Sequence, residues 1–129
     1  MSYKNLEIWQ LAKVASIEIH KMTLHELPKF EHYEVGSQIR RSVKSVRSNI
    51  VEGYGRRTYQ AELYKHIVYS LASNDETTDH LETLYETGSL KNEILFQDLK
   101  NKLEVLGKKL NLFMKAVEKN LPSTRKKPK

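Results

Sequence analysis

Apolar residues recur with helical spacing in four segments of the chain, and short stretches containing proline, glycine or polar residues separate these segments. The last segment, from about Asn92 to Asn120, is the most regular, because its apolar residues are spaced 4, 4, 3, 4, 3 and 4 positions apart. These residues are Leu95, Leu99, Leu103, Leu106, Leu110, Phe113 and Val117. The spacing predicts a long amphipathic helix that buries one stripe.

Three further helices are predicted upstream. The first covers about 6–22, the second about 33–52, and the third begins near Thr58 and ends at Thr87–Gly88. The second has a heptad-like stripe, and we expect Gly53 to end it in a left-handed conformation. Thr58 is expected to cap the third helix. Polar residues interrupt the core-facing stripe of the third helix at Asn74, Asp75 and Thr78.

The links between these helices are short, which favours antiparallel neighbours. The prediction is therefore an all-α fold, an antiparallel up-down-up-down four-helix bundle formed by residues 1–121. A coiled coil with a partner chain is an alternative use of the last stripe, but the stripes of the other three helices favour burial within the chain. Residues 122–129 contain no apolar side chain besides proline and are expected to form a disordered basic tail.

Composition narrows the class of protein further. The 129 residues include no cysteine, so disulfides and thiolate chemistry are excluded. We see no signal peptide and no apolar run long enough to span a bilayer, and we expect a cytoplasmic protein without a membrane role. The net charge is +6, and four of the positive charges lie in the tail, at Arg125, Lys126, Lys127 and Lys129. Such a tail suits either electrostatic contact with nucleic acid or a solubilising role.

Catalytic and metal-binding signatures are missing from the sequence. A di-metal site in a four-helix bundle needs Glu-x-x-His on two helices, whereas Glu62 with His66 and Glu76 with His80 are spaced four apart on one helix. The turn around Gly53 and Gly55 lacks the remaining residues of a phosphate-binding loop. We therefore predict that the chain is not an enzyme and has no metal site and no cofactor.

The second predicted helix carries a basic stripe beside its apolar one. Arg40, Lys44 and Arg47 are spaced 4 and 3 positions apart, Arg41 lies next to them, and Arg56 and Arg57 follow the helix. Like charges at this spacing repel each other, so an anionic partner is favoured over a simple solvated face. Phosphate groups of a nucleic acid are one candidate. Carboxylates are the other, because the late third helix contains Asp75, Glu76, Asp79, Glu82 and Glu86, which could pair with the stripe within the bundle or between subunits.

The opposite flank of the second helix is small and polar, with Gln38, Ser42, Ser45 and Asn49 spaced 4, 3 and 4 positions apart. Close packing inside the bundle is slightly favoured over a subunit contact or a pore lining for this flank.

Several short stretches resemble a known family. They are Leu6 to Ala12, Gln38 to Ser42, Ser48 to Arg56, the pair Ser73 and Glu76, and Gly88 to Leu90. Together they resemble the four-helix bundle family first noticed in intervening sequences of bacterial 23S ribosomal RNA. The resemblance covers about residues 3–118, and its most specific part is the Asn-Ile-x-Glu-Gly-Tyr-Gly-Arg stretch that begins at Asn49.

The resemblance implies a bundle that assembles into a ring-like homopentamer. The family is similar to accessory proteins of diversity-generating retroelements, which contact nucleic acid and a reverse transcriptase through basic surfaces. Carried over to this chain, the resemblance implies that the nucleic-acid-binding residues are Arg40, Arg41, Lys44, Arg47, Arg56 and Arg57, and that Asn49, Glu52 and Gly53 are structural. Family members often have proline where this chain has Arg47, which implies a straighter and more basic second helix here. The resulting hypothesis is a non-enzymatic oligomeric module that binds structured RNA or a nucleic-acid-processing partner; the alternative is a self-assembling protein-interaction scaffold.

Overall fold

Four long helices form the protein in the computed structural model, which describes residues 2–122. The bounds of the elements are η1 Tyr3–Asn5, α1 Glu7–His25, η2 Lys29–Tyr33, α2 Val35–Gly55, α3 Gln60–Glu86 and α4 Glu93–Glu118, where η marks a short 3-10 helix. The tail expected at 122–129 lies outside the described residues except for Pro122.

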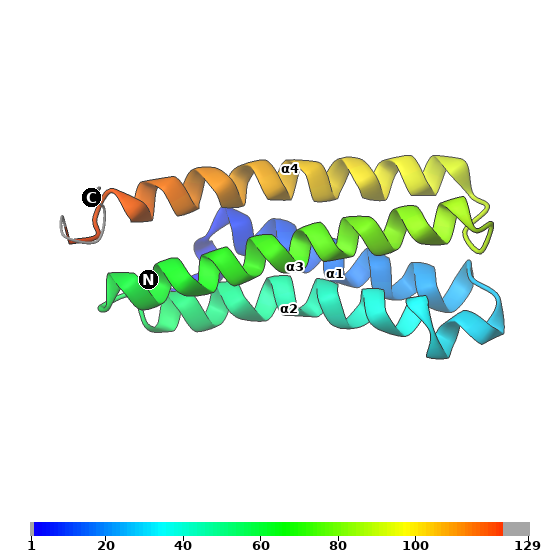
Figure 1. Cartoon of the computed structure of the whole chain (residues 1–129), viewed down its shortest axis with the longest axis horizontal. Coiled ribbons are helices and arrows are strands. Elements are labelled where there is room, and N and C mark those ends of the chain that lie inside the picture. Colours follow the sequence, from blue (N-terminus) through cyan, green and yellow to red (C-terminus); the bar gives the residue numbers. More distant parts are fainter. Residues whose placement is uncertain (1, 123–129) are drawn as a thin grey trace, which may run out of the picture.

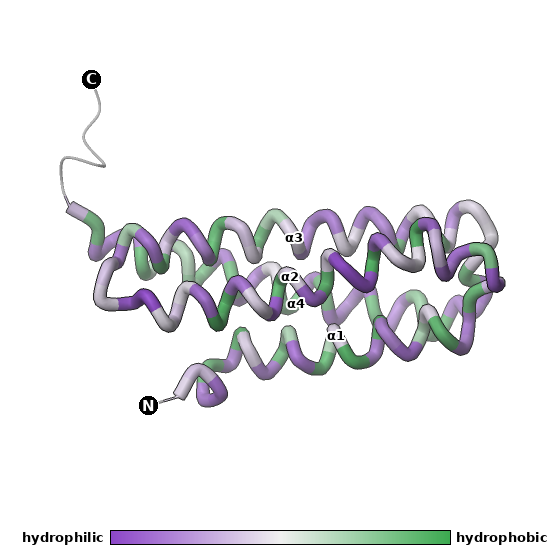
Figure 2. Tube along the Cα trace, turned by 90° about the horizontal axis from the view of Figure 1, so that it is seen from below, coloured by the Kyte–Doolittle hydropathy of each residue, from purple (hydrophilic) through white to green (hydrophobic). Residues whose placement is uncertain are grey.

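The helices lie side by side with their long axes roughly aligned, and the chain reverses direction at each link (Figure 1). Each helix packs on two others: α1 on α2, α2 on α3, α3 on α4, and α4 back on α1. This closed cycle of contacts confirms the predicted all-α four-helix bundle. Figure 2 shows apolar and polar residues alternating around every helix, as amphipathic helices in a shared core require.

The core contains the predicted stripes. In α2, Ile39, Val43, Val46 and Ile50 are completely buried, and in α4 so are Leu103, Leu106 and Leu110. The apolar stripe of α4 is therefore used by the chain's own core. Burial of this kind stabilises a bundle by about 1.5–3 kcal/mol for each large apolar side chain. On α3, Asn74 is buried as part of the predicted polar interruption, whereas Asp75 is exposed.

Gly53 does not end α2 in a left-handed conformation, so that prediction is wrong. Gly88 is the one described residue with a positive φ, at 84°, while α2 continues through a buried Gly53 to Gly55. The reason is packing: a Cβ on Gly53 would lie 2.9 Å from the Cβ of His66 on α3. The glycine at position 53 therefore allows α2 and α3 to approach closely, and it does not serve as a residue with positive φ at a helix end.

The expected cap of the third helix is also wrong. Tyr59 precedes α3, and no side chain at that position accepts a hydrogen bond from the first turn. At the start of α2, the carboxylate of the buried Glu31 accepts a hydrogen bond from the Val35 backbone N–H at 3.0 Å and another from the Ser89 hydroxyl at 2.7 Å. One carboxylate thus joins η2, α2 and the α3–α4 link.

Among residues 2–122, no helix is both long enough and apolar enough to cross a membrane.

Candidate nucleic-acid interface

Arg40, Lys44 and Arg47 of α2 lie along the seam between α1 and α2. Arg40 donates hydrogen bonds to the Thr23 hydroxyl of α1 at 3.1 Å and to the His32 carbonyl at 2.9 Å. Arg47 donates to the Ser16 hydroxyl at 3.3 Å, and its guanidinium lies 5.1 Å from the centre of the Trp9 ring. Both guanidinium groups are therefore held against α1, and each keeps unused N–H donors.

Lys44 lies between these two arginines and is exposed. Within the described chain it forms no hydrogen bond and no ion pair. The ring of His20 on α1 is close enough to Lys44 and Arg40 for their charges to act on it. Lys13 adds a further cation, with its ammonium 5.6 Å from the centre of the Trp9 ring. We call Lys13, His20, Arg40, Lys44 and Arg47 the basic seam.

No carboxylate of either helix compensates the basic seam. Between Val35 and Val51, α2 contains neither Asp nor Glu. The two glutamates of α1 pair with lysines of α4: Glu18 with Lys102 at 2.6 Å and Glu7 with Lys109 at 3.4 Å. Because α4 borders the other flank of α1, the positive charges of the seam are left without counter-charges from their own helices.

The pKa of His20 responds to burial first and to the charges of the basic seam second. Burial, followed by the positive charges of Lys44 and Arg40, lowers the pKa of His20 below its ordinary value of 6.5. Only the part of this shift that comes from Lys44 and Arg40 has the sign of a potential that attracts an anion.

The other predicted contact residues lie elsewhere. Arg41 is exposed beside α3 and lines a polar notch of about 340 Å³ with Ser45, Ser73 and Glu76. Arg56 and Arg57 lie at the end of the bundle, beyond the last turn of α2. The six predicted residues therefore do not form one surface. Three belong to the basic seam, one lies at the notch, and two lie at the α2–α3 turn.

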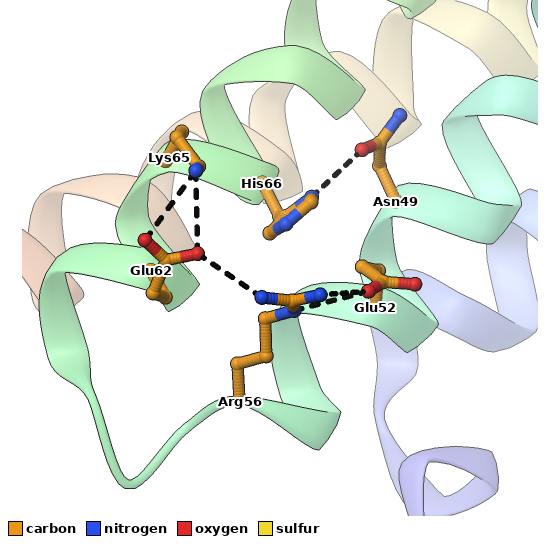
Figure 3. A network of polar contacts seen from close by, with 6 residues as sticks. All are labelled: Asn49, Glu52, Arg56, Glu62, Lys65 and His66. Carbon is orange, nitrogen blue, oxygen red and sulfur yellow. Dashed lines mark hydrogen bonds and ion pairs between the residues drawn. The ribbon is translucent and has the colours of Figure 1, made fainter.

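Arg56 is neutralised by its neighbours, as Figure 3 shows. Its guanidinium contacts the Glu52 carboxylate at 2.8 Å and the Glu62 carboxylate at 3.5 Å, and Lys65 shares Glu62 at 3.2 Å. Arg57 donates to the Tyr54 carbonyl at 2.9 Å, and its guanidinium lies 4.1 Å from the centre of the Tyr54 ring. Arg56 thus stabilises the turn, and its charge contributes little to an anion-binding surface.

Pairing of the basic stripe with the acidic part of α3 does not occur among the described residues. No ion pair joins Arg40, Lys44 or Arg47 to a carboxylate of α3 within residues 2–122. Glu82 instead contacts Lys100 of α4 at 3.4 Å, and Glu76 contacts His80 at 3.3 Å. The carboxylates of late α3 could therefore pair with the basic stripe only between subunits.

The small polar flank of α2 packs on α3, which was the favoured interpretation. The hydroxyls of Ser42 and Thr77 are 2.8 Å apart, and those of Ser45 and Ser73 are 2.9 Å apart. Asn49 donates to the Ser45 carbonyl and accepts from Nδ1 of His66 at 3.0 Å (Figure 3). Because the Asn49 amide oxygen faces His66, Nδ1 of this ring carries a hydrogen.

The described residues contain no group of three or more His, Cys, Asp or Glu side chains placed to hold a metal ion. His66 bonds to Asn49 and not to Glu62, so the sequence pair Glu62 and His66 is not formed.

Lys13 and His20 were missed at the sequence level. They lie seven residues apart on α1, a spacing that places both on one side of a helix. That regularity is visible in the sequence. What the sequence does not show is that this side of α1 faces the basic side of α2.

The fold and the seam together define a class: four-helix bundles with an uncompensated basic face. The chain belongs to the 23S rRNA-intervening sequence protein family, whose sequence pattern matches residues 4–112. A crystal structure of a protein of unknown function from the S23 ribosomal protein family of Bacteroides thetaiotaomicron is similar to this chain, with a TM-score of 0.72 and 21% sequence identity. The match covers 84% of this chain and 95% of that protein, and at this identity it supports the fold. No curated protein matches the chain at a significant level.

Proposed function

We propose that the protein is a non-enzymatic, oligomeric helical module that binds structured RNA or another nucleic acid through the basic seam of α1 and α2. The observation that carries the proposal is the direction of the α1 carboxylates. Glu7 and Glu18 pair with α4, which leaves the four lysine and arginine side chains of the seam without a carboxylate from α1 or α2. Phosphate groups supply the missing negative charge.

The residues of the seam have different roles in this proposal. Hydrogen bonds to α1 hold the guanidinium groups of Arg40 and Arg47 in place. The N–H donors that these bonds do not use are available to a phosphate. Lys44 is exposed and has no competing partner within the described chain. A phosphate binds most readily at Lys44, with the two arginines on either side of it. Lys13 extends the positive surface onto α1.

Binding of a structured RNA hairpin, measured by fluorescence anisotropy across a salt series, tests the proposal. Lys44→Ala is the sharpest variant, because it removes a charge that holds no part of the fold together. We expect a weaker affinity and a smaller dependence on salt, with the slope of log K against log salt reduced by about one unit. Replacing Arg40 is less informative, because its hydrogen bonds join α1, α2 and η2.

Two control variants separate the seam from other sources of charge. Lys91→Ala removes an exposed lysine from the α3–α4 link, outside the seam. A full-length chain with serine at Arg125, Lys126, Lys127 and Lys129 removes the tail charges. If binding depends on the tail charges alone, or if Lys44→Ala and Lys91→Ala have equal effects, the basic seam is not the nucleic-acid interface.

A protein-interaction scaffold is the second candidate function, and one observation favours it. The carboxylates of late α3 do not pair with the basic seam of their own chain, so they are available to a seam on another copy. In that case Lys44→Glu disrupts the oligomer and RNA binding is absent. Light scattering distinguishes the two functions, because the nucleic-acid proposal expects Lys44→Glu to lose RNA while its mass is unchanged.

A further inference from the structure

A second charged surface lies across the bundle from the basic seam. An open groove of about 560 Å³ runs between α3 and α4. Its carboxylates are Asp75, Asp79, Glu82 and Glu104, and Lys108 is its one cation. Glu82 contacts Lys100, whereas Asp75, Asp79 and Glu104 form no hydrogen bond or ion pair with the rest of residues 2–122. The groove is therefore acidic overall.

Asn74, which lines the groove, also indicates a ligand that donates hydrogen bonds. Its side chain is 3% exposed, and its Nδ2 donates to the Leu103 carbonyl at 3.0 Å. That carbonyl can only accept, which fixes the orientation of the amide. The Asn74 Oδ1 is left without a donor among the described residues, and such a buried acceptor costs about 1–3 kcal/mol. Acceptors of this kind are satisfied by N–H or O–H groups, and not by an anion.

Gly107 of α4 packs closely on Asn74 at the floor of the groove. A Cβ at that position would lie 3.0 Å from the Asn74 Nδ2. Carboxylates at the rim, an unsatisfied acceptor below and a glycine floor together favour a cationic N–H donor, such as a lysine or arginine side chain.

This chain contains a segment with the matching charge. Arg125, Lys126, Lys127 and Lys129 follow Pro122 within seven residues and include no acidic residue among them. Seven residues can span at most about 25 Å. From the end of α4 back to Lys108, about ten to twelve residues of helix correspond to roughly 15–20 Å. The far end of the segment, Lys127 to Lys129, is thus within reach of the half of the groove that contains Asp75.

We propose that the groove between α3 and α4 is a docking site for a basic peptide segment, and that its occupant is residues 125–129 of the same chain. Docking needs no nucleic acid and does not depend on the function of the basic seam. Its consequence is that the charges of the segment are held on the acidic side of the bundle at low salt and are released as salt screens the contact.

The experiment compares amide chemical shifts of uniformly labelled full-length protein with those of the full-length variant that has serine at Arg125, Lys126, Lys127 and Lys129. We expect shift differences at Asp75, Asp79 and Gly107 in low salt, and loss of these differences at high salt. Two further pairs of spectra test the groove. Asp75→Asn/Asp79→Asn should abolish the differences, and Glu86→Gln, an exposed carboxylate of α3 outside the groove, should retain them.

A synthetic peptide of residues 120–129 gives a second measurement. Added to the serine-tail variant, it should reproduce the shifts at Gly107, and its affinity should fall about tenfold in the Asp75→Asn/Asp79→Asn background. Identical groove spectra for the wild-type and serine tails, or an equal loss in Glu86→Gln, would overturn the proposal. Groove shifts that grow with protein concentration would also overturn it, because the occupant would then be a second copy. Thermal unfolding of each variant confirms that all of them are folded.

Discussion

Gly53 and Gly55 lie two residues apart in the last turns of α2 and have different surroundings. A Cβ on Gly53 would lie 2.9 Å from the His66 Cβ and 3.3 Å from a Leu63 methyl group, whereas a Cβ on Gly55 would meet nothing within 4 Å. Neither glycine has a positive φ. The same substitution at the two positions therefore separates packing from backbone entropy.

Gly53→Ala should destabilise the protein by about 1–3 kcal/mol, because the methyl group forces α2 and α3 apart. Gly55→Ala should be neutral or stabilising by up to about 1 kcal/mol, since alanine loses less backbone entropy in a helix. Denaturant unfolding of both variants measures the two effects. Equal effects of the two substitutions would contradict the close packing of α2 on α3.

His20 gives a prediction about pH. Its pKa is lowered in the folded protein, so between that lowered pKa and 6.5 the unfolded chain binds more protons than the folded one. The free energy of unfolding is therefore not reduced by His20 above pH 6.5. It decreases as the pH falls from 6.5 towards the lowered pKa, because protonation of His20 favours the unfolded chain. Lys44→Gln should raise the pKa of His20 and weaken this dependence, as an NMR titration of the ring would show.

Bound RNA should act on His20 in the same direction as Lys44→Gln. A phosphate beside Lys44 offsets the positive charges that lower the pKa of His20, so the pKa should rise in the complex. The control is His80, which contacts Glu76 on α3, outside the basic seam. Equal shifts of both rings on adding RNA would indicate a general effect of RNA and not binding at the seam.

At the scale of elements, α2 and α3 are joined by a ladder of polar side chains. Ser42 and Thr77 form one of its steps and are almost fully buried. Ser42→Ala and Thr77→Val should each cost about 0.5–1.5 kcal/mol, because the hydrogen bond between the two hydroxyls is lost. The hydroxyl that remains still bonds to a carbonyl of its own helix, Ser73 for Thr77 and Ile39 for Ser42. The double variant should cost at least 0.5 kcal/mol less than the two single effects combined, which is about the smallest coupling seen for residues in contact.

Ser48→Ala is the control for this cycle. Ser48 is exposed, and its hydroxyl bonds only within α2, to the Ser45 carbonyl at 3.3 Å. Its removal should change the free energy of unfolding by no more than about 0.5 kcal/mol. Strict additivity of Ser42→Ala and Thr77→Val would show that the ladder does not couple the two helices.

The sequence predicts the features of a single helix well, but it does not predict the features that depend on which helices are neighbours. Apolar spacing predicted all four helices and their core stripes, because burial of a stripe is a property of one helix. The partners of Arg40 and Arg47 were not predictable in this way, since they depend on which helix lies alongside. Gly53 was misassigned for the same reason: its conformation is set by His66 and Leu63 of α3, and the local sequence equally fits a helix end.

For the molecule as a whole, the two flanks of α1 differ in character. One flank forms the basic seam with α2. The other borders an apolar groove of about 230 Å³ lined by Leu11, Val14 and Val105, and the exposed α4 residues Leu112 and Ile94 add to the apolar surface of that helix. Exposed apolar surface of this kind is typical of a protein–protein contact.

If the protein is an oligomer whose basic seam is open to nucleic acid, its subunit contact should use the apolar α1–α4 flank. Val105→Glu/Leu112→Glu should then reduce the mass measured by light scattering to that of one chain, because charges replace apolar contact area. About 1 M salt should leave the wild-type mass unchanged. At this concentration salt screens interactions between charges that are more than a few ångströms apart, but it does not weaken apolar burial. Lys44→Glu is the matched control, because it introduces the same side chain on the other flank of α1 and should retain the oligomer. Dissociation by Lys44→Glu and by salt, with Val105→Glu/Leu112→Glu still assembled, would instead place the subunit contact at the basic seam and favour the scaffold function. A single-chain mass for the wild-type protein at all concentrations would contradict both oligomeric proposals.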